Sequence, residues 1–514
     1  MNKNAKRKEI KNQGKSTKYI KSSVKIVSVF LILVITVVFN ASTVGATESK
    51  ALNLDYLNSI MELIDSKYAG EVDNNKLLEG VLKGIFGSLD PYTQFYTPEE
   101  AKQFFGSVEG SYEGIGIAIE KQNNVIIITK VFPGTPADQA GLIQGDKIIS
   151  IDMKSTADMT VEEAANYIRG LTGTKVTLGI MRGNSNDAKI VEVERKKIKL
   201  NPVTYEIKGD IAYIKLETFN ANTEEFFNDA LKEIDDKGIS KIILDLRDNP
   251  GGLVDQGVAL ARHFVPKGLI TKLVFKSEDM PDQEYNSYLE NPKYKLVVLV
   301  NEMSASASEI VAGAIQDTKA GTIVGTKTYG KAKVQNLLPI LTPEAYEKYA
   351  KIVNDKVVEA YDLISKHGVN PLNSEVLGWI KITTGYYVTP NNRMIDGEGI
   401  TPDVIVESTT VVDGIHINSI QKLSLTWKPT LGDDGLDVYN AEKILKLLGY
   451  DIGTPDTYLD EKTYSQISKF RTDRGFYAGG VLDFTTQKAL NEAYEFLRIL
   501  YDKQYAKALE ILRK

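Results

Sequence analysis

The chain contains no cysteine, which excludes disulfide scaffolds, cysteine nucleophiles and thiolate metal sites. Histidine is scarce as well: only His263, His367 and His416 occur, widely spaced and outside any HExxH pattern. A zinc site or a histidine-based catalytic triad would need nearly all of them, so we predict no metal site and no cofactor. The net charge of −6 gives no overall attraction for nucleic acid, and we predict no such partner.

The composition is that of a folded protein with an added leader. Of 514 residues, 42% are hydrophobic and 25% are charged, and the length corresponds to about three or four domains. In the N-terminal residues 1–46, nine lysines and arginines and a single acid precede the apolar run Ile26–Phe39. We predict a signal peptide that ends near Ala46 or an uncleaved membrane anchor over Val24–Val44; a buried core helix is the simpler alternative. The charge pattern favours insertion with the N-terminus inside, so we expect an exported, extracytoplasmic protein of a bacterium, anchored in the membrane or secreted to the cell envelope.

Hydrophobic periodicity divides the rest of the chain into regions of different type. We predict a helical module over 47–105, a β-rich domain over 106–195, an alternating α/β region over 196–407, a polar linker over 408–431 and a helical region over 432–514. A charged, mostly helical insertion over 343–379 interrupts the α/β region. Alternating strands and helices are typical of a layered core with a largely parallel sheet.

Three serines compete for the role of nucleophile in one strand-to-helix turn. The predicted strand Leu296–Val300 leads into Asn301–Glu309, and a helix follows. A hydroxyl at a helix N-terminus lies near the positive end of the helix dipole, which favours an alkoxide or a nearby oxyanion. Ser304, Ser306 and Ser308 all fit this place, and Ser308 is the natural N-cap. Taken alone, the segment also fits a capped turn with solvating serines.

A serine nucleophile needs a base, and the histidines are poorly placed for this role. Lys331 lies downstream in a glycine-led, partly apolar segment. An ammonium group in water has a pKa near ~10.4, but burial lowers such a pKa by up to ~3–5 units and yields a neutral amine base. Gln335 lies four residues further on, on the same face, and could orient the amine. A solvated lysine is the simpler alternative.

A glycine pair supplies a third element. The predicted strand Lys241–Leu246 ends in Arg247–Gly252, and a helix begins at Leu253. Paired glycines allow backbone N–H groups to approach a developing oxyanion. An ordinary glycine turn between strand and helix is the alternative.

In combination, these motifs resemble those of the C-terminal processing peptidases, also called tail-specific proteases. The resemblance rests on Asp245–Gly252, Ser304–Ile310 and Gly330–Gln335, and on an N-terminal signature over Asp90–Thr93 and Thr97–Glu100. It implies a multidomain α/β protein: a crotonase-like serine protease core with an inserted β-rich PDZ domain, an N-terminal helical module and a small C-terminal helical domain. It also implies catalysis by a Ser-Lys dyad.

Matching the motifs residue by residue assigns the site that the resemblance implies. Ser306 is the nucleophile, Lys331 the general base and Gln335 the residue that positions it; the oxyanion hole is formed by the N–H groups of Ala307 and of Gly251 or Gly252. One departure is Ala332, where the family usually has glycine. If that position needs a positive φ, alanine there is strained.

The two accessory regions imply partners. Gly114, Ile115, Gly116 and Ile117 resemble the loop with which a PDZ domain binds a terminal carboxylate, before the strand that pairs with the peptide. Proteins or peptides with free C-termini are therefore the expected partners, and Arg169 is a candidate sensor of a bound peptide or a structural arginine. Residues 432–514 resemble a peptidoglycan-binding domain, which makes peptidoglycan a candidate partner and leaves a generic helical bundle as the alternative. We also expect a homodimer through the N-terminal helices and membrane association of the N-terminus.

The sequence therefore predicts an exported serine endopeptidase that captures protein tails with its PDZ domain and cleaves them. A non-catalytic envelope adaptor with the same two binding modules is the alternative from another class. A hydrolase that acts on peptidoglycan is a second alternative.

Overall fold

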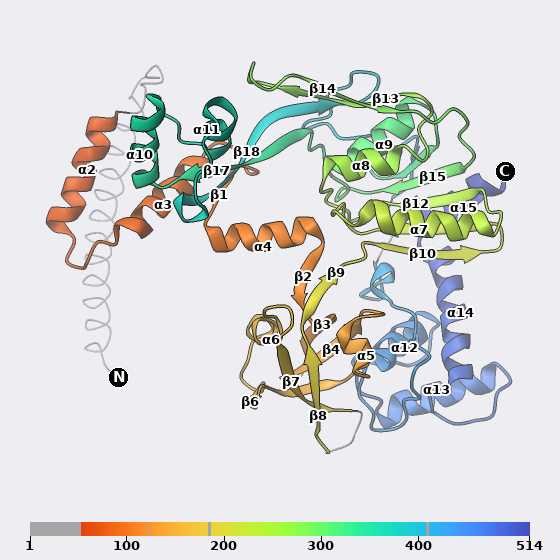
Figure 1. Cartoon of the computed structure of the whole chain (residues 1–514). Coiled ribbons are helices and arrows are strands. Elements are labelled where there is room, and N and C mark those ends of the chain that lie inside the picture. Colours follow the sequence, from red (N-terminus) through yellow and green to blue (C-terminus); the bar gives the residue numbers. More distant parts are fainter. Residues whose placement is uncertain (1–52, 123, 183–186, 408–410) are drawn as a thin grey trace, which may run out of the picture. The chain divides into compact units, whose positions relative to one another are not determined.

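The computed structural model describes residues 53–122, 124–182, 187–407 and 411–514 (Figure 1). The chain divides into two compact units, Met1–Gly80 and Val81–Lys514. The predicted leader over residues 1–46 lies outside the described residues. Among the residues that are described, no helix is both long enough and apolar enough to cross a membrane.

The N-terminal region is helical, as predicted. Its helices are α2 (Leu54–Lys67), α3 (Asn74–Gly87) and α4 (Pro98–Glu109). Helix α4 begins with a capping box formed by Thr97 and Glu100, and a proline occupies its first turn. A short strand, β1 (Gln94–Tyr96), precedes α4 and was not predicted.

The β-rich region forms a six-stranded antiparallel sheet in the order β3-β4-β5-β7-β8, with β6 paired to β5. Its elements are β3 (Ile117–Gln122), β4 (Val125–Val131), α5 (Pro136–Gln139), β5 (Lys147–Ile151), β6 (Lys154–Ser155), α6 (Val161–Ile168), β7 (Lys175–Met181) and β8 (Lys189–Glu194). Its β-branched runs supply buried side chains such as Ile126, Ile148 and Val176. The chain enters and leaves this region through the paired strands β2 (Ser111–Gly114) and β9 (Lys196–Lys199).

The predicted parallel sheet is present, in the order β10-β11-β12-β15-β16-β19, with only its edge strand β10 antiparallel (Figure 1). Its strands are β10 (Val203–Lys208), β11 (Ile211–Leu216), β12 (Lys241–Asp245), β15 (Lys295–Val300), β16 (Thr322–Gly325) and β19 (Val404–Ile405). The helices that follow its strands are α7 (Thr223–Asp236), α8 (Val254–Ala261) and α9 (Ala307–Asp317).

Both faces of this sheet are buried, which explains why its strands are apolar throughout. Side chains such as Ile242 and Val298 pack with α7, α8 and α9 on one face. Their neighbours Ile243 and Val297 pack on the other face against α15 (Lys503–Arg513). Each fully buried aliphatic side chain contributes about 1.5–3 kcal/mol. Helix α15 therefore completes the core around the parallel sheet, although the sequence placed it in a separate C-terminal region.

A second, five-stranded antiparallel sheet has the order β1-β18-β13-β14, with β17 also paired to β18. Its longer strands are β13 (Gly268–Phe275), β14 (Gln283–Ser287), β17 (Lys333–Leu341) and β18 (Val376–Val388). Between β17 and β18 lie α10 (Pro343–Val353), α11 (Ala360–His367) and a 3₁₀ turn (Asn373–Glu375). The predicted helical insertion over 343–379 is thus helical only to Glu375, because β18 begins at the next residue.

The C-terminal helical region contains α12 (Leu436–Leu447), α13 (Glu461–Asp473) and α14 (Phe484–Tyr501) around an apolar cluster of their own. Asp460 and Asp483 cap α13 and α14, as the Asp-x-x-Thr spacing predicts. In the linker before them, a short hairpin pairs β20 (Val411–Val412) with β21 (Ile415–His416).

Candidate active site

Ser306 differs from its two neighbouring serines. Ser304 and Ser308 are fully buried, and their hydroxyls donate to the carbonyls of Leu246 at 2.8 Å and Asn249 at 2.9 Å. Ser306 is half-buried, and its side chain makes no capping bond. The helix begins at Ala307 with Ser306 as N-cap, so the prediction that Ser308 caps it is wrong. Only Ser306 presents a hydroxyl that the fold does not already use.

The backbone at Ser306 is strained. Its φ is +55° with ψ −116°, a region that residues with a side chain rarely adopt. Such strain is retained where the surrounding structure over-determines it, as in the sharp strand-to-helix turns that expose a nucleophilic serine.

The carboxylate of Glu309 fixes this turn and joins it to the segment that carries Lys331. It is fully buried on α9, and its Oε2 accepts the backbone N–H groups of Ser306 and Lys331, each at 2.9 Å. Its Oε1 accepts the hydroxyl of Thr328 at 2.6 Å and the N–H of Gly330 at 2.7 Å. Glu309 had no predicted role in the site, although its spacing from Ser306 is that of a capping box.

Tyr387 joins the same two segments on their carbonyl side. Its hydroxyl lies 3.0 Å from the carbonyl oxygen of Ser306 and 2.7 Å from that of Lys331, and it shares its single proton between them. The side chain is almost fully buried on β18, and this burial raises the pKa of Tyr387, which keeps the hydroxyl protonated. No sequence pattern singled out this residue.

Lys331 is half-buried just before β17. Burial lowers the pKa of its amine, and the neighbouring Lys381 ammonium lowers it further, against the opposing effect of Asp90 and Glu309. This direction is the one that a general base requires. Ala332, the departure from the family pattern, is not among the residues with positive φ, so the strain considered for it is absent.

Gln335 contacts Thr383 and not Lys331, its predicted partner. It lies opposite Thr383 in the β17–β18 pair, and its Nε2 donates to the Thr383 hydroxyl at 3.3 Å. In the described part of the chain no hydrogen bond joins Gln335 to Lys331. The amine instead lies 4.5 Å from the ring centroid of Tyr92.

The glycine pair lies directly against Ser306, the candidate nucleophile. A Cβ on Gly251, whose φ is +95°, would lie 2.7 Å from Ser306 Cβ and 2.9 Å from the N atom of Ala307. The position therefore requires glycine. The N–H of Gly251 donates to Asn249 Oδ1 at 2.9 Å. Two hydrogen bonds form the bridge between Phe219 and Gly252: the Phe219 N–H donates to the Gly251 carbonyl, and the Leu253 N–H donates to the Phe219 carbonyl. The N–H of Gly252 takes no part in this bridge.

Comparisons with known proteins show the family to which the chain belongs. Family models match at residues 210–406 (peptidase family S41), 103–181 (PDZ domain) and 434–490 ("Putative peptidoglycan binding domain"). A carboxy-terminal-processing protease of Bartonella bacilliformis is 32% identical over 74% of this chain and 81% of its own length. The chain belongs to the carboxy-terminal-processing proteases of peptidase family S41. It is therefore a serine-type peptidase.

Two further proteins are similar to this chain. A "Probable CtpA-like serine protease" of Staphylococcus aureus strain MSSA476 is 29% identical over 96% of this chain and 92% of its own length. The solved structure of the photosystem II D1 C-terminal processing protease covers 68% of this chain and 86% of its own, with 24% identity and a TM-score of 0.37.

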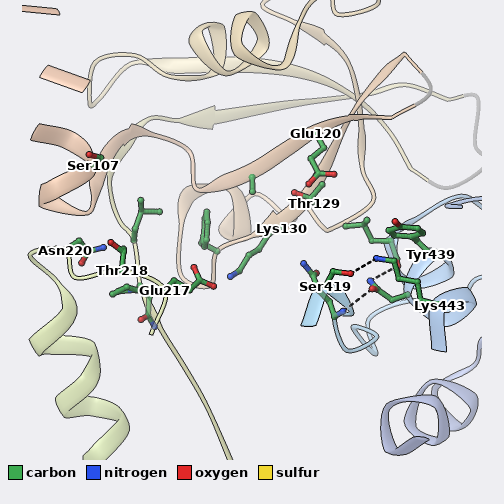
Figure 2. A pocket seen from close by; sticks show the side chains of 18 residues that line it. Ser107, Glu120, Thr129, Lys130, Glu217, Thr218, Asn220, Ser419, Tyr439 and Lys443 are labelled. Carbon is green, nitrogen blue, oxygen red and sulfur yellow. Dashed lines mark hydrogen bonds between the residues drawn. The ribbon is translucent and has the colours of Figure 1, made fainter. Parts of the chain in front are cut away.

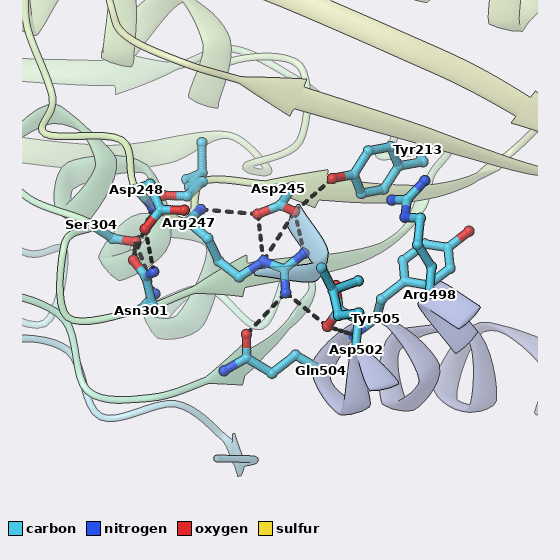
Figure 3. A network of polar contacts seen from close by, with 12 residues as sticks. Tyr213, Asp245, Arg247, Asp248, Asn301, Ser304, Arg498, Asp502, Gln504 and Tyr505 are labelled. Carbon is cyan, nitrogen blue, oxygen red and sulfur yellow. Dashed lines mark hydrogen bonds and ion pairs between the residues drawn. The ribbon is translucent and has the colours of Figure 1, made fainter. Parts of the chain in front are cut away.

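A buried ionic network links the glycine loop Arg247–Gly252 of the S41 core to the start of α15 (Figure 3). Arg247 Nε donates to both carboxylate oxygens of Asp245, at 2.9 and 3.0 Å. Its Nη1 reaches Asp502 Oδ1 at 2.8 Å and Gln504 Oε1 at 3.1 Å, at the start of α15. Burial alone would raise the pKa of Asp245, but the adjacent Arg247 charge lowers it. The loop that leads to Gly251 is thus tied to the last helix.

The PDZ domain presents the predicted loop at the start of β3. Gly116 has a φ of +91°, and a Cβ there would overlap the side chain of Thr135, so only glycine fits. The carbonyl of the buried Ile115 accepts the N–H of Ala137, which places the loop against α5. Arg169 is exposed at the C-terminal end of α6, and its guanidinium lies 5.8 Å from the ring centroid of Tyr112 on β2.

A cavity of about 620 Å³ lies elsewhere (Figure 2). Its lining includes Glu120 and Lys130 of the PDZ domain, Glu217 of the core, and Ser419 and Lys443 of the C-terminal region. None of the candidate catalytic side chains lines it. Its charges are of both signs, so it shows no preference for a ligand of either charge.

Proposed function

We propose that this peptidase cleaves the C-terminal tails of proteins with Ser306 as nucleophile and Lys331 as general base. The observation that carries the proposal is the double link between their backbones, through the Glu309 carboxylate and the Tyr387 hydroxyl. Of the three serines, only Ser306 has an accessible hydroxyl that is not used by the fold, and burial lowers the pKa of Lys331.

In the proposed reaction, Ser306 Oγ attacks the scissile carbonyl carbon while the neutral amine of Lys331 takes its proton. The resulting ammonium then protonates the leaving amine of the peptide. Water hydrolyses the acyl-enzyme, with Lys331 again as the base. The N–H groups of Ala307 and Gly252 stabilise the oxyanion, since the Gly251 N–H is already donated to Asn249.

The PDZ domain supplies the substrate class. We infer that the N–H groups of the loop Gly114–Ile117 bind the free carboxylate of a tail, and that the tail pairs with β3. Arg169, exposed beside this loop, would interact with the bound tail. Gln335 keeps its proposed role only if the amine moves towards it when substrate binds.

The site of action is proposed to be the cell envelope. The charged and apolar leader over residues 1–46 supports export, and the match to a peptidoglycan-binding domain supports peptidoglycan as a partner. Membrane association of the leader and a homodimer through the N-terminal helices stay predictions.

Cleavage of an unfolded protein with a free C-terminus tests the proposal. Wild type should shorten it and should act less on the same protein with an amidated C-terminus, because the carboxylate is then missing. Ser306→Ala should abolish cleavage and the labelling by a serine-reactive phosphonate, whereas the matched control Ser308→Ala should retain both. Undiminished cleavage by Ser306→Ala would contradict the assignment.

The same assay separates the alternative functions. A non-catalytic adaptor would bind the tail and leave it intact in the wild type as well. A peptidoglycan hydrolase would release soluble muropeptides from purified sacculi and leave the protein substrate uncut.

A further inference from the structure

The N-terminal motif Asp90–Thr93 has no role in the function described so far, although its turn lies beside the active site. Asp90 Oδ1 accepts the N–H groups of Tyr92 at 2.8 Å and Thr93 at 2.9 Å, which fixes the turn. The hydroxyl of the buried Thr93 accepts the N–H of Thr383 on β18 at 3.2 Å. Strand β1 then pairs with the same strand. The position of Tyr92 is therefore set by the antiparallel sheet.

The half-buried ring of Tyr92 faces the catalytic amine. Lys331 Nζ lies 4.5 Å from the ring centroid, and Lys333 Nζ lies further away, at 5.7 Å. Burial and a hydrogen bond with Tyr329 raise the pKa of Tyr92, so the phenol stays neutral. The ring thus offers Lys331 the negative face of a quadrupole without a full negative charge.

The carboxylates around Lys331 are engaged elsewhere. Both oxygens of Glu309 accept backbone N–H groups, and Asp90 accepts those of its own turn. Lys381, on β18, contributes a repelling charge. The described residues give Lys331 Nζ no ion pair and no hydrogen bond. Among the described residues, the direct contact of the amine is therefore the ring of Tyr92, and the charges of Lys381, Asp90 and Glu309 act on it without a hydrogen bond or ion pair.

We propose that Tyr92 is the positioning residue for Lys331, and that its ring face stabilises the ammonium that forms when the amine takes the Ser306 proton. This inference rests on the proposed function. A carboxylate in direct contact would favour the charged amine by about 1–3 pH units and leave little free base. A cation–π contact raises the pKa of the amine by less, about half a unit or more. It therefore stabilises the ammonium without keeping the resting amine charged.

The first test is the pH profile of tail cleavage. Leucine and methionine at this position keep an apolar contact but remove the quadrupole. Tyr92→Leu and Tyr92→Met should move the acidic limb of kcat/KM to lower pH by about half a unit or more, and should lower the plateau, because the base becomes weaker. Tyr92→Phe, the matched control, keeps the ring and should leave the limb in place. A purely structural role would lower the plateau without moving the limb.

The second test does not depend on catalysis. In the full chain with Ser306→Ala, ¹³Cε-labelled lysine is titrated by NMR, and the Lys331 signal is assigned from its loss in Lys331→Gln. The midpoint should fall in Tyr92→Leu and stay in place in Tyr92→Phe. Thermal unfolding of each variant confirms that it is folded, and Tyr92→Met replaces Tyr92→Leu if that variant does not fold.

The two tests separate this inference from the function on which it rests. If the midpoint moves but Lys331→Ala still cleaves tails, the contact stands and the proposed catalytic role of Lys331 fails. If Lys331→Ala is inactive but neither the limb nor the midpoint moves in the folded leucine and methionine variants, the positioning role of Tyr92 is wrong.

Discussion

Beside the parallel sheet, the turn that carries Ser306 is held by buried hydrogen bonds, whereas the amine of Lys331, beside the antiparallel sheet, has no hydrogen bond among the described residues. Ser306 follows a strand of the first sheet, and around it Ser304, Ser308 and Asn249 all bond within the fold. Lys331 precedes a strand of the second sheet and contacts mainly an aromatic face. The comparison teaches that many hydrogen bonds hold the turn around Ser306, the proposed nucleophile, whereas burial, a neighbouring charge and an aromatic contact set the proton affinity of Lys331, the proposed base.

Removing the amine should have the largest effect. We expect Lys331→Ala to lower kcat for tail cleavage by about 10⁴-fold or more, because no other group takes the serine proton. Lys333→Ala, at the first residue of β17 and two residues from Lys331, is the matched control and should keep most of the activity. Single-turnover acylation measures both. Comparable losses in the two variants would break the assignment of the base to Lys331.

Weakening the link between the two sheets should come next. Glu309→Gln keeps the size of the side chain but replaces one accepting oxygen with an NH₂ group. This donor then faces backbone N–H groups or a hydroxyl that donate to Glu309 in the wild type. We expect a loss of about 10²-fold in kcat from misplacement of the dyad, and a loss of about 2–4 kcal/mol in the free energy of unfolding. Chemical denaturation measures the second quantity. Wild-type values for both would show that Glu309 holds neither segment.

The pH dependence isolates the antiparallel sheet. Because burial and Lys381 lower the pKa of Lys331, the amine loses its proton below the ordinary lysine value of 10.5, and activity should rise with pH through that pKa. Below it, each pH unit should cost about tenfold in kcat/KM. Lys381→Gln removes the repelling charge and should move the limb to higher pH. A limb centred near ~6.5 would indicate a histidine instead.

The smallest effect is expected from the contact between Arg247, beside the parallel sheet, and Asp502 at the start of α15. Asp502→Asn keeps a hydrogen-bond acceptor for Arg247 but removes the charge, so we expect a loss of about 1–3 kcal/mol in the free energy of unfolding and a few-fold loss in kcat. Asp451→Asn, at an exposed ion pair with Lys462, is the control and should change little. Equal effects in the two variants would show that α15 does not support the loop.

The sequence was informative where local pattern decides the structure. The apolar, β-branched runs predicted β15 and β12 to within one residue, since strands with buried faces need such side chains. The serine motif offered three candidates, and only burial and hydrogen bonding distinguish Ser306 from the other two. Matching to the family had already selected it.

Contacts between distant segments could not be predicted in this way. Strand β1 pairs with β18 but has only three residues, which is too few for an alternation of apolar and polar side chains to indicate a strand. The partner of Gln335 depends on the register of β17 against β18, which places Thr383 opposite it. Likewise, nothing in the pattern of residues 503–513 shows that this helix packs on the parallel sheet.

The position of α15 has a consequence for synthesis. The face of the sheet formed by Ile243, Val297 and Leu299 is covered by a helix that is translated after both the PDZ domain and the C-terminal module. A nascent chain that has reached α14 still exposes this apolar face and lacks the Asp502 contact to Arg247. The second face of the parallel sheet is thus covered, and the Arg247 network beside the glycine loop completed, only once α15 has been synthesised.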